Sequence, residues 1–276
     1  MVEIKPAWSE QFDAGRLRQI APLGLDAPIT KEWAWGGATG AGVKVAVIDS
    51  GIQADHPAVG GVSGAVILEY NPDSPDADEN GIVFTHGPHE DLYGHGTACA
   101  AIIRKVAPEC ELYSLRVLGA RLTGKGIVFA AALDWAIENG MNVVNLSLST
   151  SKQDHFAMFH EIVDDAYFHN VMLVSAINNV PSPSYPSQYA GVFSVAAHDG
   201  KDPFSFDYNP APPVEFGAPG IDLEVAWQEG SYIEATGNSF AAPHIAGLVA
   251  RILSKHPGLT PFQMKTILAS LATNVM

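Results

Sequence analysis

The 276-residue sequence has little cysteine and no long apolar run. Its two cysteines, Cys99 and Cys110, are too few for the disulfide framework that stabilises many small secreted domains. They are either free buried thiols or one bridge, because their separation in space cannot be obtained from their spacing. No stretch of about 18 apolar residues occurs without a charge, so we expect no membrane span.

Positive charge is also scarce. Lys and Arg number 15 against 30 Asp and Glu, which gives a formal net charge of −15. This excess repels phosphate backbones and anionic lipids, so neither a nucleic acid nor a membrane surface is an expected partner. Residues 1–12 are polar and lack the apolar stretch of a signal peptide. We therefore expect a cytoplasmic protein; the alternative is a secreted protein whose signal and pro-segment are missing from this chain.

The composition is that of a well-packed globular protein. Hydrophobic residues make up 47% of the chain and charged residues 16%. A chain of this length lies at the upper end of what one hydrophobic core can organise. We therefore expect a single domain, residues 1–276, with residues 1–41 forming an N-terminal segment that packs on it. The sequence carries no information on the oligomeric state.

Short apolar strands alternate with helical segments through most of the chain. Strands are expected at 43–48, 111–118, 142–148, 171–176 and 192–197. Helices are expected at 97–106, 126–140, 156–169 and 239–255, and a short one within 26–35. This alternation predicts an α/β fold with a mostly parallel sheet. The acidic, turn-rich segment 71–81 is expected to be an exposed loop.

Three short motifs place an acid, a histidine and a serine at the ends of predicted elements. Asp49 follows a buried strand, His95 opens a helix in Gly-His-Gly-Thr, and Ser239 opens another in Gly-Asn-Ser-Phe-Ala-Ala-Pro-His. In parallel α/β sheets, ligands bind where the carboxyl ends of strands meet. There one nitrogen of His95 can donate to Asp49 while the other accepts the proton of Ser239. Singly, the motifs are typical of a turn, a metal-binding or structural histidine, and a helix cap; together they indicate a serine nucleophile.

The order Asp, His, Ser and the residues around each motif resemble the subtilisin-like serine peptidases. The resemblance extends over residues 42–268. It implies a three-layer fold with helices on both faces of the sheet, and a serine endopeptidase that works through an acyl-enzyme without a required cofactor. It also implies an asparagine that binds the oxyanion. Asn178 occupies that place by register, and Asn179 is the alternative because Ile177 replaces the family's usual glycine.

The same resemblance implies a cleft that binds a protein or peptide in an extended conformation. Its walls are expected to comprise Leu118, Gly119, Gly124, Ser147, Leu148, Ser149, Ser175, Ala176 and Asn238. Ser184 is expected near the base of the primary pocket. Because none of these residues is charged, we expect a neutral residue before the cut.

Three functions are compatible with such a cleft. General proteolysis is the main expectation. Dedicated processing of one precursor peptide is an alternative within the same chemistry. A catalytically silent peptide-binding module is the alternative from another class, and the presence of all three triad residues argues against it.

Two segments contain side chains that commonly bind metals. Asp76, Asp78 and Asn80 match the first half of a calcium loop, but Gly87 stands where a bidentate glutamate is needed. A solvated acidic loop is therefore preferred, with calcium binding as the alternative.

A zinc cluster of His86, His89 and His95 is disfavoured by the catalytic role of His95, so no metal site is expected. Cys99 follows His95 by one helical turn, which predicts a thiol close to the imidazole. It acts there either as a packed small hydrophobe or as a reactive group.

Overall fold

A computed structural model describes residues 28–275. Its main strands are β1 (Lys44–Asp49), β2 (Gly64–Tyr70), β3 (Ile82–His86), β4 (Glu111–Arg116), β5 (Val143–Leu146), β6 (Met172–Ala176), β7 (Phe193–His198), β8 (Asp207–Tyr208) and β9 (Phe216–Pro219). They form one sheet in the order β3-β2-β4-β1-β5-β6-β7-β9-β8. A separate antiparallel pair joins β10 (Leu223–Ala226) to β11 (Tyr232–Ala235).

The sheet is parallel except at its two edges. All pairs from β2 to β9 run parallel, whereas β3 and β8 are antiparallel to their neighbours. A parallel sheet is covered on both faces, so its central strands are apolar without alternation. The burial of β1 follows this rule, because every residue from Val45 to Asp49 is buried. The carboxyl end of β1 therefore brings a carboxylate into the interior.

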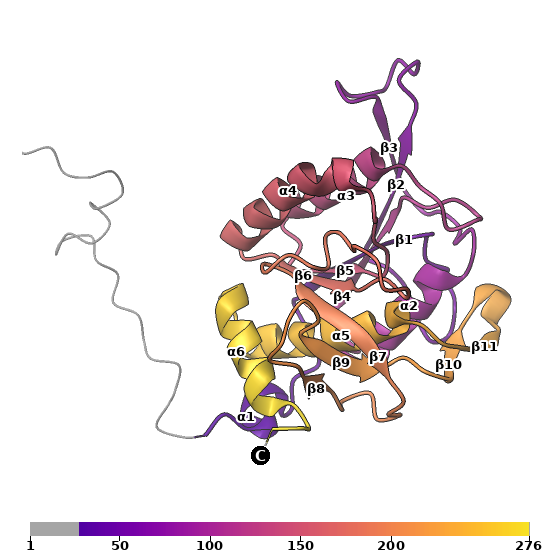
Figure 1. Ribbon diagram of the computed structural model, residues 1–276. Helices are drawn as coiled ribbons and strands as arrows, with labels where there is room; N and C mark the ends of the chain where they lie inside the picture. The colour runs from indigo at the N-terminus through magenta and orange to yellow at the C-terminus, as the bar shows by residue number, and fades with distance from the viewer. Residues whose placement is uncertain (1–27, 276) are drawn as a thin grey trace, which may run out of the picture.

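The helices are α1 (Lys31–Trp35), α2 (His95–Val106), α3 (Gly126–Glu138), α4 (Phe156–Phe168), α5 (Asn238–Lys255) and α6 (Pro261–Leu271), with short 3-10 turns at Gln153–His155 and Gln228–Gly230. Helices α3 and α4 cover one face of the sheet, and α2 and α5 cover the other (Figure 1). The expected three-layer α/β architecture is confirmed.

Helix α5 is the central helix of the fold. It contacts β5, β6, β7 and β9, and it packs along α2. The two helices approach closely at Gly247, where an added Cβ would stand 2.7 Å from the Cβ of Val106. Close packing of this kind resists displacement, because interiors have the density of organic crystals. The first turns of α2 and α5 are therefore held at a fixed separation.

The predicted strands and helices are confirmed, with ends that differ by a few residues. Helix α2 begins at His95, two residues before the predicted start, and β4 ends at Arg116. The acidic segment 71–81 is the connection of an unpredicted hairpin, β2–β3, which projects from the body of the molecule (Figure 1). Helix α6 and strands β8 to β11 were also not predicted.

The N-terminal segment can be followed from residue 28, and residues 1–27 lie outside the described part. Helix α1 packs on the end of α5. The Lys255 ammonium donates to the carbonyl of Glu32 at 2.6 Å, and the Trp33 ring stacks on His256 with centroids 4.2 Å apart. Within residues 28–275, no helix is both long and apolar enough to cross a membrane. Both cysteines are free, so the alternative of a bridge between them is wrong.

Candidate active site

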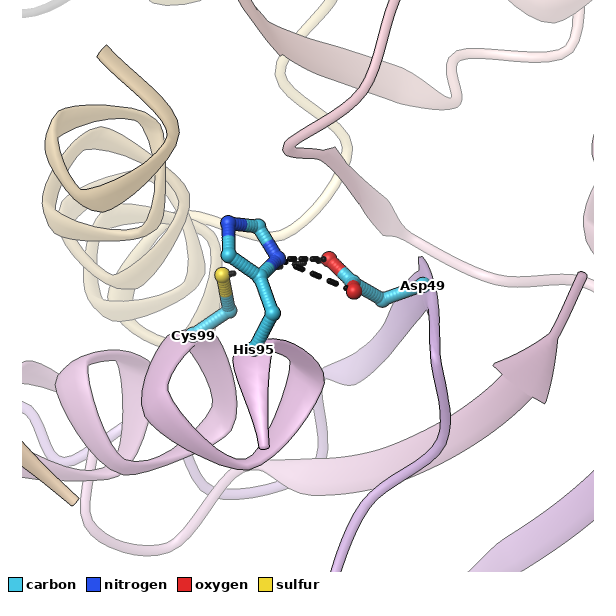
Figure 2. A group of neighbouring side chains, drawn as sticks. All are labelled: Asp49, His95 and Cys99. Carbon is cyan, nitrogen blue, oxygen red and sulfur yellow. Dashed lines mark hydrogen bonds and ion pairs between the residues drawn. The ribbon is translucent and has the colours of Figure 1, made fainter. Parts of the chain in front are cut away.

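Asp49 and His95 form a buried pair at the carboxyl edge of the sheet. The imidazole Nδ1 lies 2.9 Å from Oδ1 and 2.8 Å from Oδ2 of the carboxylate, while the other ring nitrogen points away from it (Figure 2). Asp49 is fully buried, and His95 is 7% exposed. Burial acts to lower the pKa of His95, but the charge and hydrogen bond of Asp49 more than offset it. The pKa is therefore raised above the ordinary 6.5.

A second buried carboxylate, Asp91, fixes the start of α2. Its Oδ1 accepts from the Ser50 hydroxyl at 2.8 Å and from the Gly94 N–H at 2.8 Å. Its Oδ2 accepts from the N–H and hydroxyl of Thr97, at 2.9 and 2.7 Å. The carboxylate thereby satisfies backbone donors that the first helical turn leaves open. The sequence reasoning missed this residue, although an acid four positions before His95 is a recognisable helix-start signal.

Ser239 lies in the first turn of α5, where a proline changes the backbone bonding. Pro243 has no N–H to donate to the Ser239 carbonyl four residues earlier, so that oxygen needs another donor. The hydroxyl of Ser147, just past β5, donates to it at 2.7 Å, and the Cys99 thiol lies 3.6 Å away. The end of the sheet therefore holds the nucleophile in place.

His95 and Ser239 both line a cleft of about 490 Å³. Its lining also includes Leu118, Leu122, Ser147, Leu148, Ser149, Ala176 and Ile177, and Tyr93, Trp227, Ile233, Ala235 and Phe240. The predicted residues Leu118, Ser147, Leu148, Ser149 and Ala176 thus line the cleft.

Both candidate oxyanion asparagines line this cleft. The Asn178 amide donates to the Ser182 hydroxyl at 2.8 Å. Asn179 uses its Oδ1 to accept the backbone N–H of Asn238 at 2.9 Å. The two side chains therefore have different hydrogen-bond partners. The Asn178 side chain is bonded to a neighbouring loop, and the Asn179 side chain to the start of α5.

Three residues expected at the substrate lie elsewhere. Ser175 and Ser184 are fully buried and lie outside the cleft lining; the Ser184 hydroxyl accepts the Asn178 N–H at 3.0 Å. The amide of Asn238 accepts the Ala197 N–H at 2.8 Å and donates to the carbonyl of Ile177 at 3.1 Å. Asn238 thus joins α5 to the sheet, and Ser184 bonds the backbone of Asn178.

The predicted edge at Gly119 and Gly124 is a turn. The Gly119 N–H donates to the carbonyl of Thr123 at 3.1 Å, which folds the segment back on itself. Gly124 lines a smaller neighbouring hollow of about 280 Å³, which shares Leu118 and Leu148 with the cleft. The cleft therefore continues past Leu148, away from Ser239.

Cys99 lies as close to the pair as predicted. Its sulfur is 3.2 Å from the Ser147 hydroxyl oxygen and 4.0 Å from Oδ2 of Asp49. Burial, with the charge of Asp49 second, raises the pKa of this thiol well above its ordinary value. Asp49, His95 and Cys99 are the one group of three metal-binding side chains found in residues 28–275, with ligand atoms within 4.8 Å. A thiol that stays protonated is a poor ligand and a poor nucleophile, so this grouping favours proton transfer.

Two of the other side chains considered as metal ligands, Asp78 and His89, have protein partners. Asp78 Oδ1 accepts the backbone N–H of Asn80 and of Ile82, at 2.9 and 2.7 Å, and so closes the hairpin loop. The His89 Nε2 is 2.8 Å from the Ser114 hydroxyl. His86, His89 and His95 do not form a cluster among the described residues. Calcium binding at Asp76, Asp78 and Asn80 stays a prediction.

A hollow larger than the cleft lies elsewhere. This cavity of about 760 Å³ lies near the start of β1 and β2, beside Tyr113 of β4 and Trp135 of α3. None of the three triad residues lines it. Reactive groups, rather than volume, identify the site.

Comparisons with known proteins agree with this geometry. The family model described as the Subtilase family matches residues 40–275. Subtilisin DY of Bacillus licheniformis is 33% identical over 93% of both chains. The alkaline protease of Alkalihalobacillus alcalophilus is 31% identical over 99% of this chain and 71% of that protein.

A solved structure supports the same assignment. A crystal structure of a cold-adapted subtilisin-like serine proteinase covers 86% of each chain with a TM-score of 0.66 at 25% identity. Sequence and fold therefore agree over most of the chain. The protein belongs to the Subtilase family and is a serine endopeptidase.

Proposed function

We propose that Asp49, His95 and Ser239 carry out peptide-bond hydrolysis through an acyl-enzyme. Ser239 attacks the scissile carbonyl while His95 takes its proton, and His95 then protonates the leaving amine. Asp49 orients the imidazole and stabilises its protonated form. Deacylation repeats these steps with water as the nucleophile. The observation that carries the proposal is the buried pair of Asp49 and His95 in a cleft that also contains Ser239.

We further propose that Asn178 and the backbone N–H of Ser239 bind the oxyanion. Negative charge develops on the substrate oxygen as the serine attacks, and donors fixed beside it stabilise the transition state. The Asn178 amide has two N–H hydrogens, so one can stay bonded to the Ser182 hydroxyl while the other donates to the oxyanion.

The residue before the cut is proposed to be neutral. No carboxylate, ammonium or guanidinium group lines the cleft. A charged side chain would lose its hydration there without a partner. The cytoplasmic location expected from the N-terminus is supported by neither the structure nor the relatives and stays a prediction.

A fluorophosphonate probe should label the native protein on Ser239. Only a serine activated by a neighbouring base reacts quickly with such a probe. Ser239→Ala should abolish labelling, while Ser151→Ala, which changes an exposed serine, should label like the native chain. Gel fluorescence with peptide mass mapping measures both. Equal labelling of Ser239→Ala and the native chain would refute the assignment.

The rate should depend on pH through His95. The imidazole must be neutral to act as a base, so kcat/KM should rise with pH through a pKa above 6.5, as the Asp49 carboxylate dictates. Asp49→Asn removes that charge. Burial, which lowers the pKa of His95, is then no longer offset by the Asp49 charge. The acid limb of the pH–rate profile should therefore move to lower pH, while kcat falls by about 10⁴. Asp164→Asn on α4 is the matched control, and a native limb below pH 6.5 would contradict the prediction.

Asn178→Ala should lower kcat by about 10²–10³ with little change in KM, as expected when a donor acts only in the transition state. Asn179→Ala should have a smaller effect on kcat, because the Asn179 side chain serves to hold the Asn238 N–H. Ser182→Ala is the control, since it removes only the hydroxyl that accepts from the Asn178 amide. Steady-state kinetics on one peptide substrate separates the outcomes. A larger loss in Asn179→Ala would transfer the oxyanion role to that residue.

A library of peptides that vary only before the cut should show a preference for Ala or Ser over Lys or Arg of at least about tenfold in kcat/KM. A strong preference of the native enzyme for Lys or Arg would exclude the proposed neutral pocket.

A further inference from the structure

The hollow of about 760 Å³ lies apart from the triad and shares no lining residue with the catalytic cleft. It is bordered by the first half of β2, the end of β3 and the last turn of α3 (Figure 1). Sites that enclose small ligands have volumes of roughly 300–1,000 Å³. The mechanism assigns no task to these walls, so the class of ligand that fits them follows from their side chains.

The hollow is electropositive within an acidic protein. Among the described residues that line it, Lys44 is the only one with a formal charge. The chain has 30 acidic residues against 15 basic ones, yet none of the acids is in this lining. Lys44 has no ion pair within residues 28–275. A ligand with a negative charge is therefore favoured here.

The imidazole of His89 adds no second cation at neutral pH. Burial, with the charge of Arg116 second, lowers the pKa of His89 below its ordinary 6.5. Its Nε2 lies 2.8 Å from the Ser114 hydroxyl, which holds the ring in place. The positive charge of the lining at pH 7 is therefore concentrated on the Lys44 ammonium.

Two aromatic side chains form much of the apolar wall. A Cβ added at Gly64 would stand 2.6 Å from the Tyr113 Cδ1, so the phenol ring lies against the bare backbone of β2. The Trp135 indole lies beside the His86 ring, with centroids 6.4 Å apart and planes tilted by 48°. Tyr113 and Trp135 both pack on the core between α3 and the sheet, and both stay partly exposed. Such rings bind a planar apolar group by stacking or by edge-to-face contact.

The charge and the aromatic wall are close to each other. The Lys44 ammonium lies 6.0 Å from the centroid of the Tyr113 ring. A carboxylate joined to an aromatic ring by a short carbon chain can reach both. A phosphate monoester carries about 1.5 to 2 negative charges at pH 7, which is more than one ammonium neutralises. A single carboxylate therefore matches the lining better than a nucleotide does.

We propose that this hollow binds an aromatic carboxylate, with the ring against Tyr113 and Trp135 and the carboxylate on Lys44. Free aromatic acids and peptides that end in an aromatic residue share this chemistry. The site lies outside the cleft and does not depend on the proposed roles of Asp49, His95 and Ser239. It would give the protein a second binding function beside peptide hydrolysis.

Calorimetric titration of the full chain tests the class of ligand. The probes are 3-phenylpropionate, N-acetylphenylalanine, N-acetylphenylalanine amide and N-acetylalanine. N-acetylphenylalanine should bind at least about tenfold more tightly than its amide, which lacks the charge that Lys44 pairs with. It should also bind at least about tenfold more tightly than N-acetylalanine, which lacks the ring.

Variants locate the binding in the hollow. Lys44→Gln should lower the affinity for N-acetylphenylalanine at least about tenfold and leave the affinity for the amide unchanged. Trp135→Ala should weaken the binding of both compounds. Lys31→Gln is the matched control, because it removes one exposed positive charge at the start of α1. If Trp135→Ala does not fold, Lys44→Gln decides, since it changes a half-buried residue at the first position of β1.

Several results would overturn the proposal. Equal affinity of the native chain and Lys44→Gln for N-acetylphenylalanine would place its binding outside the hollow. Equal affinity of the native chain for the acid and its amide would exclude the carboxylate, and tighter binding of AMP would exclude a single charge. No detectable binding of either acid at millimolar concentration would also overturn it. With the expected results in hand, tighter binding of 3-phenylpropionate supports a free acid as the ligand, and tighter binding of N-acetylphenylalanine supports a peptide end.

Discussion

The contact between α2 and α5 is the packing on which the site depends. Each helix carries one residue of the proposed triad in its first turn, His95 in α2 and Ser239 in α5. Small residues let the two helices approach closely, and a Cβ added at Gly247 would stand 2.7 Å from the Cβ of Val106. Because neither helix can shift without opening a dense interior, the separation of base and nucleophile is a property of the core. Catalysis gains its preorganisation from packing far below the cleft.

Buried charge is the cost of this arrangement, and the structure compensates it with dense hydrogen bonding. Asp49 accepts from the His95 imidazole and from the Ser50 N–H. Asp91 accepts from backbone and hydroxyl groups of the loop and of the first turn of α2. An ionised carboxylate in a protein interior is tolerated only when donors of this kind surround it. The two carboxylates have different roles. Asp49 polarises the His95 imidazole, and Asp91 fixes the start of α2, the helix that carries His95.

The sequence was informative where chemistry is local. The apolar run before Asp49 predicted a buried parallel strand, and the start of α2 at His95 lies within two residues of its predicted position. These features follow from burial on both faces of a sheet and from helix-start chemistry, which act over a few residues. The triad itself was proposed from the resemblance of these motifs, and of their order, to the subtilisin-like serine peptidases.

Features that depend on distant contacts could not be predicted. Ser184 was expected near the base of the primary pocket, but it does not line the cleft, and its hydroxyl accepts the Asn178 N–H. Asn238 was expected at the substrate, yet its side chain is bonded to Ala197 of strand β7. Trp227 was not expected in the cleft, because its indole is placed by contact with Gly94, more than a hundred residues earlier in the chain. Residue type alone does not reveal which partner a polar or aromatic side chain will find.

The proline at position 243 has a consequence for motion at the nucleophile. Helix ends ordinarily fray, since their terminal groups are bonded to water and open on short timescales. Here the carbonyl of Ser239 is tied to Ser147 at the end of a central strand, so the terminal turn shares the order of the sheet. Fraying of the first turn of α5 should therefore not displace Ser239. Its position should become less ordered only when the β-sheet itself begins to open.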